Sequence, residues 1–384
     1  MRKILSAIGL LAFLTLSAQQ NVHLKSPGQS PVIGDDGKVT FNLHAPGAKM
    51  VQLAGHLPGQ PIEMIQQEGN WTATIEGLEP DIYDYWFEID SVRTMDPSNP
   101  YVVRDVAYLS NIFVVTDNGY SPYLTNDVPH GKVEKVWYHS DKLGGDRRMS
   151  IYTPPGYDGK TGKYPVLYLL HGMGGDEEAW QDLGRTVQML DNLIASGQAE
   201  PMIVVMPNGN ALLQAAPGFS TMGLYTPEGN QSVDPDRSFE AAFPEIVAFV
   251  EDNYLVDPSK SKNAIAGLSM GGGHAWKISM MMPDKFDYVG MFSPAIWWDG
   301  RGVPVDMNHP EVVPMLERQF QSAPQFYWIA IGNEDFLYDL NAHYRNLLDS
   351  HGFPYEYYES EGGHTWVNWR HYLLKFLPRL FKTD

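Results

Sequence analysis

Hydrophobic and polar residues alternate along much of the first third of the chain. The alternation has a period of two and is clearest over residues 39–43, 71–75 and 83–89. Such runs are typical of half-buried strands, and turn-forming clusters such as Pro58-Gly59 separate them. No helical period occurs in this stretch. The pattern therefore predicts a small antiparallel β-sandwich of the immunoglobulin-like type over residues 19–117.

The pattern changes from residue 132 to the end of the chain. Short apolar runs at residues 166–170, 202–206, 263–267 and 326–332 have the length of buried strands. Between them, residues 186–195, 239–254, 270–282 and 341–350 have the periodicity of helices. Alternating strands and helices predict a mostly parallel sheet covered on both faces, preceded by an antiparallel hairpin at residues 133–139 and 148–152. We therefore expect an α/β domain over residues 132–384.

Residues 118–131 separate the two patterns. Gly119, Pro122 and Pro129 lie there among polar residues, a composition suited to a linker. We expect this segment to stay out of a packed core. A chain that starts near Lys132 should then fold without the sandwich.

The first residues have the pattern of a secretory signal peptide. Arg2 and Lys3 precede an apolar run at residues 4–16, and small or polar residues follow it. The run is short for a membrane span, although a membrane anchor or a buried helix is the alternative. We expect a signal peptide over residues 1–18, cleaved near Ala18, and hence a secreted or periplasmic protein with no membrane attachment after cleavage.

Composition excludes some partners. The 384 residues are 43% hydrophobic and 19% charged, as in an ordinary globular protein. Lys and Arg sum to 27 against 46 Asp and Glu, a formal charge of −19. This balance argues against binding nucleic acid or an anionic membrane, which need a basic surface. The chain has no cysteine, so it has neither a disulfide framework nor a lipid anchor on cysteine.

A candidate nucleophile lies between an expected strand and an expected helix. The motif is Gly267-x-Ser269-x-Gly271. A serine on a sharp strand-to-helix turn requires flanking positions without side chains, and the turn directs the N–H of Met270 at a developing oxyanion. The pattern alone is weak, because glycine-rich helix starts also produce it. Its position after a strand and before a helix favours an α/β-hydrolase nucleophile.

A serine hydroxyl needs a base and an orienting acid, which this fold class supplies in the order Ser, acid, His. His364 follows two glycines just before a terminal amphipathic helix, whereas His274 lies inside the nucleophile helix, where it would pack or face solvent. Asp335 follows an expected strand at its carboxyl end, where open α/β sheets place their sites. Glu334 and Asp339 compete for the same role.

A second glycine-rich turn, His171-Gly-Met-Gly-Gly175, follows another expected strand. It can supply the second oxyanion donor through the N–H of Met173. His171 is a weaker candidate base, because it precedes the nucleophile in the chain. No grouping of His, Asp and Glu has the spacing of a metal site, and we expect no cofactor.

The combined motifs resemble a known family. They are His171-Gly-Met-Gly-Gly, Gly267-Leu-Ser-Met-Gly-Gly-Gly, Gly332-Asn-Glu-Asp and Gly362-Gly-His-Thr-Trp. From residue 133 to the end, the chain is similar to the feruloyl and acetyl-xylan esterases of carbohydrate esterase family one, in the esterase-D-like group. Siderophore esterases, S-formylglutathione hydrolases and mycolyltransferases share these motifs. The sandwich resembles the isoamylase-N-terminal type of carbohydrate-binding module, through residues 41–46, Trp71 and residues 83–87.

The resemblance implies a secreted serine esterase that acts on feruloyl esters of plant cell-wall xylan. Acetyl-xylan esterase is the second choice, followed by a siderophore esterase and a non-catalytic carbohydrate-binding protein. The signal peptide argues against the siderophore esterase, and the complete set of catalytic residues argues against the non-catalytic protein. Trp298 and Trp366 lie close to the site motifs and could stack on a ferulate ring, although packing tryptophans are equally common there. Residues 208–236 are expected to form a long loop near the pocket.

Overall fold

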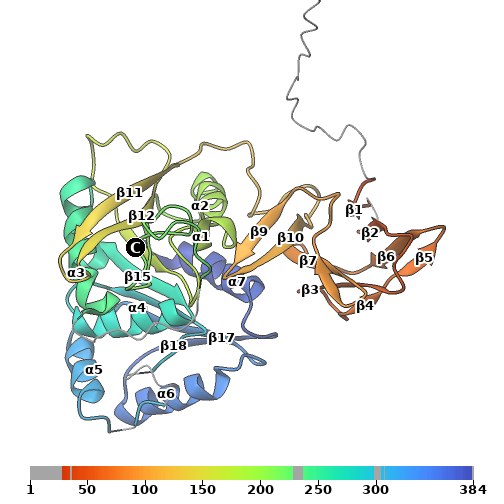
Figure 1. Cartoon of the computed structure of the whole chain (residues 1–384). Helices are drawn as coiled ribbons and strands as arrows, with labels where there is room; N and C mark the ends of the chain where they lie inside the picture. The colour runs from red at the N-terminus through yellow and green to blue at the C-terminus, as the bar shows by residue number, and fades with distance from the viewer. Residues whose placement is uncertain (1–27, 35–36, 228–236, 298–303, 307, 383–384) are drawn as a thin grey trace, which may run out of the picture.

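The computed structural model describes residues 28–34, 37–227, 237–297, 304–306 and 308–382, and Figure 1 shows them as two adjoining parts. β-Strands build the N-terminal part, and a sheet with helices on both faces builds the C-terminal part. The expected signal peptide lies outside the described residues. In the part of the chain that the structure describes, no helix is long and apolar enough to cross a membrane.

Two antiparallel sheets form the N-terminal part, in agreement with the predicted sandwich. One has the strand order β1-β2-β6-β5, and the other has the order β4-β3-β7-β10-β9 with β8 paired to β7. The strands are β1 (Val32–Ile33), β2 (Val39–His44), β3 (Val51–Gly55), β4 (Ile62–Glu63), β5 (Ile65–Gln67), β6 (Asn70–Ile75), β7 (Ile82–Ile89), β8 (Val92–Thr94), β9 (Val102–Asp105) and β10 (Tyr108–Val114).

The period-two pattern places the sandwich core. Alternate residues of β2, β6 and β7 are buried, as expected for strands with one face on a core. Phe41 of β2 lies opposite Ala73 of β6 in the strand register, and its ring meets the edge of Tyr85 at 4.8 Å between centroids. Burial of these aromatic rings stabilises the contact between the two sheets.

An eight-stranded sheet forms the centre of the C-terminal part. Its order is β11-β12-β14-β13-β15-β16-β17-β18, with β12 antiparallel to both neighbours and parallel pairing from β14 to β18. The strands are β11 (Lys132–Ser140), β12 (Gly145–Thr153), β13 (Val166–Leu170), β14 (Ile203–Pro207), β15 (Asn263–Leu268), β16 (Tyr288–Phe292), β17 (Phe326–Gly332) and β18 (Glu356–Ser360). β11 and β12 are the predicted hairpin.

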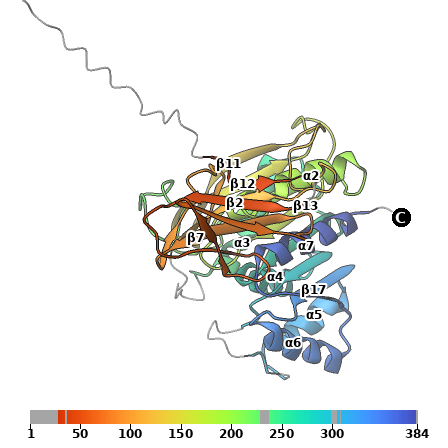
Figure 2. The same cartoon turned by 90° about the vertical axis from the view of Figure 1, so that its right-hand side faces the viewer.

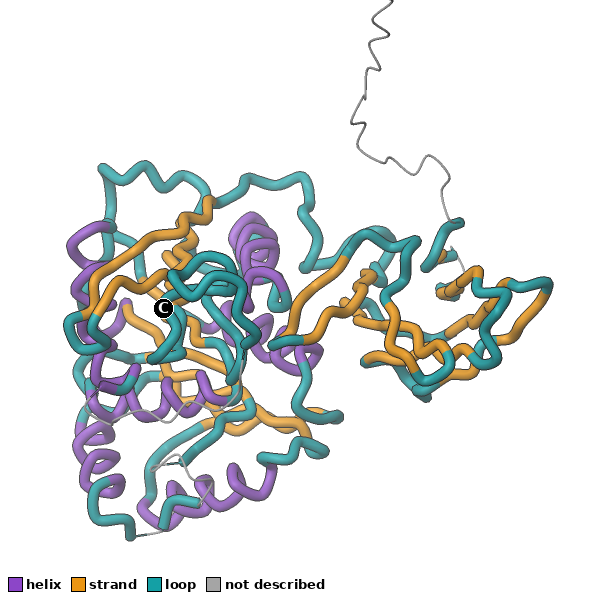
Figure 3. The backbone as a smooth tube through the Cα atoms, viewed as in Figure 1, coloured by secondary structure: helices purple, strands orange, loops and turns teal. Residues whose placement is uncertain are grey.

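Helices cover both faces of this sheet (Figure 3). Buried residues of α3, α4, α5 and α6 share one apolar cluster, and those of α1, α2 and α7 share another with alternate residues of the same strands. The helices are α1 (Ala179–Asp182), α2 (Thr186–Ala195), α3 (Phe239–Asn253), α4 (Met270–Met281), α5 (Val312–Gln321), α6 (Tyr338–His351) and α7 (Trp366–Phe376), with short 3₁₀ helices η2 (Lys260–Lys262) and η3 (Leu377–Arg379).

The two parts pack together through buried groups. Figure 2 views the molecule from the side of the sandwich, which lies against the helical part. Arg370 of α7 is 4% exposed, and it donates to the Ile82 carbonyl at 2.7 Å and to the Leu183 carbonyl at 3.1 Å. Its second partner in the sandwich is the Asp81 carboxylate at 3.3 Å. Ile82 itself belongs to the apolar cluster of the C-terminal part.

The segment at residues 118–131 is packed rather than loose, so the expectation that it stays out of a core is wrong. Tyr123 is 2% exposed and lies in the same apolar cluster as α2. Its carbonyl accepts from Arg185 Nε at 3.1 Å, and Asn126 donates to the Asn192 side chain at 2.9 Å. One aromatic side chain in a polar segment is enough to anchor it. A chain that starts at residue 132 would lack Tyr123 and expose the surface that it covers.

Candidate active site

Ser269 lies at the junction between β15 and α4. Its φ is +52° and its ψ is −117°, a conformation that residues with a side chain seldom adopt. Its N–H donates to the Phe292 carbonyl at 2.9 Å, and its carbonyl accepts from Gly273 at 3.0 Å and from Ala295 at 2.9 Å. These bonds hold a strained turn at the carboxyl end of a central strand, which is the position of a nucleophile in this class of fold.

Close backbone contacts explain the glycines on either side of Ser269. A Cβ on Gly267 would lie 2.3 Å from the Gly271 carbonyl oxygen, and a Cβ on Gly271 would lie 2.4 Å from the Leu170 carbonyl oxygen. Backbone atoms cannot move aside as a flexible side chain can, so any other residue would open the turn. The Gly-x-Ser-x-Gly spacing therefore has a steric cause here.

The structure brings His364 and Asp335 together. His364 Nδ1 lies 2.8 Å from Asp335 Oδ2, and the other carboxylate oxygen accepts from the Leu337 N–H at 2.9 Å. Asp335 is 4% exposed. A carboxylate that accepts from Nδ1–H orients the imidazole and leaves Nε2 free to take a proton.

Backbone contacts also fix the two loops that carry this pair. Glu334 N–H donates to the Gly362 carbonyl at 3.0 Å, and a Cβ on Gly332 would lie 2.1 Å from that same oxygen. The acid loop after β17 and the base loop after β18 therefore touch. Since β15, β17 and β18 run parallel, their carboxyl ends and Ser269 share one edge of the sheet.

The competing residues have other surroundings than His364 and Asp335. Glu334 and Asp339 are exposed, in contrast to Asp335. His274 pairs with Glu240, with 3.0 Å between Nδ1 and Oε1, and its ring packs 5.0 Å from that of Phe239. Burial opposes the charge of the Glu240 carboxylate. The electrostatic attraction and hydrogen bond of His274 outweigh burial, so the pKa of Glu240 lies below its ordinary value. His274 is thus engaged away from Asp335.

The two expected oxyanion donors flank the nucleophile. Met270 is the first residue of α4, so its N–H belongs to the first turn, where helix N–H groups have no partner within the helix. A Cβ on Gly172 would lie 3.3 Å from Ser269 Cβ, so the glycine-rich turn passes directly beside the serine. Met173 follows Gly172, and its side chain is 54% exposed. Both residues therefore lie next to a residue in contact with Ser269 or follow it directly, and the use of their N–H groups as oxyanion donors stays a prediction.

His171 is a buried strut beneath this turn. Its Nε2 accepts from the Gly209 N–H at 2.8 Å, so Nδ1 carries the proton and donates to the Gly172 carbonyl at 2.7 Å. The ring is 1% exposed, and burial lowers the pKa of His171 to about 4. A neutral ring with both nitrogens engaged cannot act as the base, in line with the expected order of the catalytic residues.

A buried polar network supports the same turn, and sequence patterns do not reveal it. Glu177 is 1% exposed and accepts from Asn208 Nδ2 at 3.0 Å, with Arg148 Nε 3.3 Å away. Burial raises the pKa of Glu177. Asn210 donates to the Gly175 carbonyl at 2.7 Å, so the long loop after β14 does reach the site. The available sequence signal is the adjacent arginine pair Arg147 and Arg148, which lies in the buried part of β12.

Trp366 begins α7 and is half-buried. Its ring meets those of Trp180 and Trp369 edge-on, each at 5.3 Å between centroids. These contacts favour a packing role, and its use in substrate binding stays a prediction. The other expected tryptophan, Trp298, lies outside the described residues.

Phe336 is an exposed aromatic residue beside His364, and the sequence patterns do not indicate it. Its side chain is 74% exposed, and its ring lies 4.5 Å from that of His364 between centroids. It directly follows Asp335, and this adjacency is the available sequence signal. A large apolar side chain left in solvent next to the candidate base is a candidate wall of a substrate pocket.

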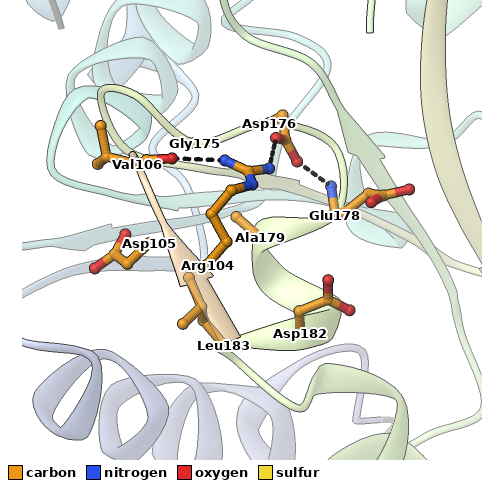
Figure 4. A pocket seen from close by; sticks show the side chains of 9 residues that line it. All are labelled: Arg104, Asp105, Val106, Gly175, Asp176, Glu178, Ala179, Asp182 and Leu183. Carbon is orange, nitrogen blue, oxygen red and sulfur yellow. Dashed lines mark hydrogen bonds and ion pairs between the residues drawn. The ribbon is translucent and has the colours of Figure 1, made fainter. Parts of the chain in front are cut away.

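A small cavity of about 70 Å³ lies near the site, between the sandwich and the glycine-rich turn (Figure 4). Its lining is polar and does not include Ser269; it consists of Arg104, Asp105, Val106, Gly175, Asp176, Glu178, Ala179, Asp182 and Leu183. Within the described ranges, no group of three or more His, Cys, Asp or Glu side chains could hold a metal ion.

Comparison with known sequences points to esterases. The profile of a protein family described as "Putative esterase" matches residues 140–380. An endo-1,4-beta-xylanase/feruloyl esterase from Xylanibacter ruminicola is 30% identical, over 94% of this chain and 47% of the relative. The chain therefore spans about half the length of that relative.

Comparison with solved structures supports the predicted α/β-hydrolase fold. A ferulic acid esterase has a TM-score of 0.54 and 27% identity, and the match covers 65% of this chain and 97% of that one. An enterobactin esterase from Shigella flexneri has a TM-score of 0.62 and 19% identity, and the match covers 89% and 92% of the two chains. The second match shows a shared fold, and its coverage extends into the sandwich.

Proposed function

Since the chain belongs to the esterase family, we propose that it is a serine ester hydrolase in which Ser269 is the nucleophile, His364 the base and Asp335 the orienting acid. The observation that carries the proposal is the strained φ of +52° at Ser269, on the sheet edge where His364 and Asp335 lie 2.8 Å apart. Strain of this kind persists where the surroundings impose it, and it gathers at reactive groups.

The chemistry follows from these positions. Ser269 Oγ attacks the ester carbonyl while His364 Nε2 takes its proton, and the N–H groups of Met270 and Met173 stabilise the oxyanion. The C–O bond of the tetrahedral intermediate then breaks, and the alcohol leaves with the proton from His364. Water repeats the sequence on the acyl-enzyme and releases the acid, which restores the serine. No metal or cofactor takes part in these steps.

For the substrate we propose feruloyl esters on plant cell-wall xylan. The Xylanibacter ruminicola relative is named as both a xylanase and a feruloyl esterase, and the ferulic acid esterase structure supports the same acyl group. The exposed Phe336 ring beside His364 provides an apolar surface for a planar aromatic acid. Acetylated xylan is the second choice. The sequence of residues 1–18 supports export from the cytoplasm. The protein would meet a cell-wall polymer only after export.

We also propose that the sandwich binds carbohydrate, although not through every residue that carries its resemblance to a binding module. Trp71, Tyr85 and Phe87 are buried in the sandwich core. Trp86 is half-buried, with the Arg93 guanidinium 3.7 Å from its ring centroid. Tyr108, whose ring centroid lies 5.5 Å from the same guanidinium, is 65% exposed. An exposed ring such as that of Tyr108 can stack on a sugar face.

A hydrolysis screen tests the proposed activity. Methyl ferulate, acetylated xylan and a catecholate siderophore, each given to the full-length protein, separate the three ester classes. We expect turnover of methyl ferulate to exceed the other two. Preference for acetylated xylan would change the proposed acyl group from feruloyl to acetyl and leave the proposed mechanism unchanged. Cleavage of the siderophore would favour a siderophore-esterase activity instead. No turnover of any ester would refute the proposal that the protein is an ester hydrolase.

Substitution of the nucleophile tests the mechanism. Ser269→Ala should lower kcat by a factor of roughly 10⁴ or more and leave the fold intact, because the residual rate comes from binding and the oxyanion donors alone. Ser261→Ala is a matched control, since Ser261 is exposed in η2 before the amino end of β15, whereas Ser269 follows the carboxyl end of that strand. Wild-type turnover in the Ser269→Ala variant would refute the assignment.

A further inference from the structure

The hairpin of β9 and β10 has an unusual tip. Val106 and Ala107 connect the two strands, with Asp105 opposite Tyr108 in the register. Val106 has a φ of +52°, whereas two-residue hairpin turns with positive φ normally use Gly, Asn or Asp. A β-branched residue disfavours this conformation strongly. Contacts outside the hairpin must therefore hold Val106 in place.

Those contacts are with the glycine-rich turn beside Ser269. A Cβ on Gly174 would lie 2.6 Å from Val106 Cγ1 and 2.9 Å from Cγ2, so the valine side chain fills the space that Gly174 leaves. Gly174 follows Met173, and Gly172 lies beside the nucleophile. The sandwich thus touches the loop that carries the proposed second oxyanion donor.

Arg104 fixes the hairpin to the same loop. One guanidinium nitrogen donates to the Val106 carbonyl at 2.8 Å, and the other pairs with the Asp176 carboxylate (Figure 4). Asp176 is 3% exposed, and its second oxygen accepts from the Glu178 N–H at 3.0 Å. A buried carboxylate needs a paired cation, and the sandwich supplies that cation to Asp176.

Asp105 connects the tip to the loop of the base. It accepts a hydrogen bond from Trp366, which lies two residues after His364, while burial raises the pKa of Asp105. Three consecutive hairpin residues therefore contact the glycine-rich turn beside Ser269 and the first residue of α7, which follows the loop of the base. Figure 1 shows β9 and β10 reaching from the sandwich toward α1 and α7.

From these contacts we propose that the tip of the β9–β10 hairpin positions the oxyanion loop, with Arg104 and Val106 as positioning residues for the Met173 N–H. The inference rests on the proposed ester hydrolysis but not on the identity of the acyl group. The sandwich then contributes to the hydrolysis of any ester, including a small soluble one. A sandwich that only binds polymer would leave such substrates unaffected.

The test uses full-length variants and para-nitrophenyl acetate, or whichever small soluble ester the wild type cleaves best. Removal of one oxyanion donor costs a factor of about 10²–10³ in kcat, so a displaced donor should cost less. We expect Arg104→Gln to lower kcat about tenfold with KM within about twofold, and Arg104→Lys to recover part of the loss. Binding of a trifluoromethyl ketone, which needs the oxyanion donors, should weaken by a similar factor.

Val106→Gly separates positioning from folding. Glycine accepts a positive φ without strain, so the thermal midpoint should stay close to that of the wild type while kcat falls several-fold. Tyr101→Ser is the matched control: Tyr101 is 70% exposed just before β9, and its loss should leave kcat unchanged.

Wild-type kcat in both Arg104→Gln and Val106→Gly would overturn the inference, as would losses confined to KM. If Arg104→Gln fails to fold, Val106→Gly decides alone. The result is distinguishable from a failure of the proposed function. If Ser269→Ala abolishes activity and the hairpin variants retain it, only the positioning role is refuted.

Discussion

The buried strut His171 leads to a prediction about acid stability. In the folded protein its pKa is about 4, against an ordinary value of 6.5, because burial disfavours the charged ring. Glutamine at this position carries a donor and an acceptor but does not titrate. Comparison of the wild type with His171→Gln therefore isolates the protonation of one side chain.

The sign and size follow from the two pKa values. Because the pKa of His171 is lower in the folded protein than in the unfolded chain, acidification protonates the unfolded chain first. The contribution of His171 to the free energy of unfolding is therefore fully present above pH 6.5 and is lost as the pH falls toward 4. The two values differ by about 2.5 pH units, and each unit corresponds to about 1.4 kcal/mol. We therefore expect His171 to remove roughly 3 kcal/mol from the free energy of unfolding between pH 6.5 and 4.

Urea unfolding followed by tryptophan fluorescence at a series of pH values measures this difference. The wild type should lose stability more steeply than His171→Gln on acidification, and the gap between the two should narrow by about 3 kcal/mol. His139→Gln is a control of opposite sign, because the Asp146 hydrogen bond raises the pKa of the exposed His139. Parallel curves for wild type and His171→Gln would show that the ring titrates normally and would refute the reasoning.

Three further predictions concern the site and the contact between the two parts. Phe336→Ala should raise KM for methyl ferulate about fivefold, or about 1 kcal/mol, and leave the hydrolysis of acetyl esters unchanged; equal losses on both esters would contradict a role of Phe336 in binding ferulate. Trp366→Ala should lower the thermal midpoint, because Trp366 loses its two ring contacts. Asp105→Asn should be more stable than wild type at pH 7, because burial raises that carboxyl's pKa, and calorimetry should find the gain absent below about pH 4. Asp81→Ala should lower the free energy of unfolding by about 3 kcal/mol, since it leaves Arg370 buried without its carboxylate, and an unchanged urea midpoint would argue against it.

Much of the α/β part could be predicted from apolar patterns. β13, β17 and α2 begin and end where the sequence places them, because fully buried strands and amphipathic helices leave continuous local signals. The patterns miss β16, where Gly290 interrupts the apolar run. A Cβ on Gly290 would lie 2.8 Å from the Phe376 ring, so the interruption serves the packing of α7. They also miss β18, a polar edge strand that lacks a second sheet neighbour.

The candidate site divides in the same way. The Gly-x-Ser-x-Gly spacing, together with its position between an expected strand and an expected helix, predicts Ser269. Gly267 meets the Gly271 carbonyl within the turn, whereas Gly271 meets the Leu170 carbonyl of β13. The pair of His364 and Asp335 could be chosen from chain order and loop position, since parallel strands bring their carboxyl ends together. The double hydrogen bond of His171 could not, because it depends on Gly209, which lies on another loop.

The contact between sandwich and site shows why local rules fail at such places. Val106 reads as an ordinary strand residue, and the period-two pattern gives no sign of where a hairpin tip will lie. What the sequence does contain is a conflict: a two-residue turn made of valine and alanine, without the glycine or asparagine that its backbone favours. Natural chains keep such a conflict where a distant contact outweighs it. Here that contact is Gly174, 68 residues further along the chain, so the turn and the glycine explain each other only in three dimensions.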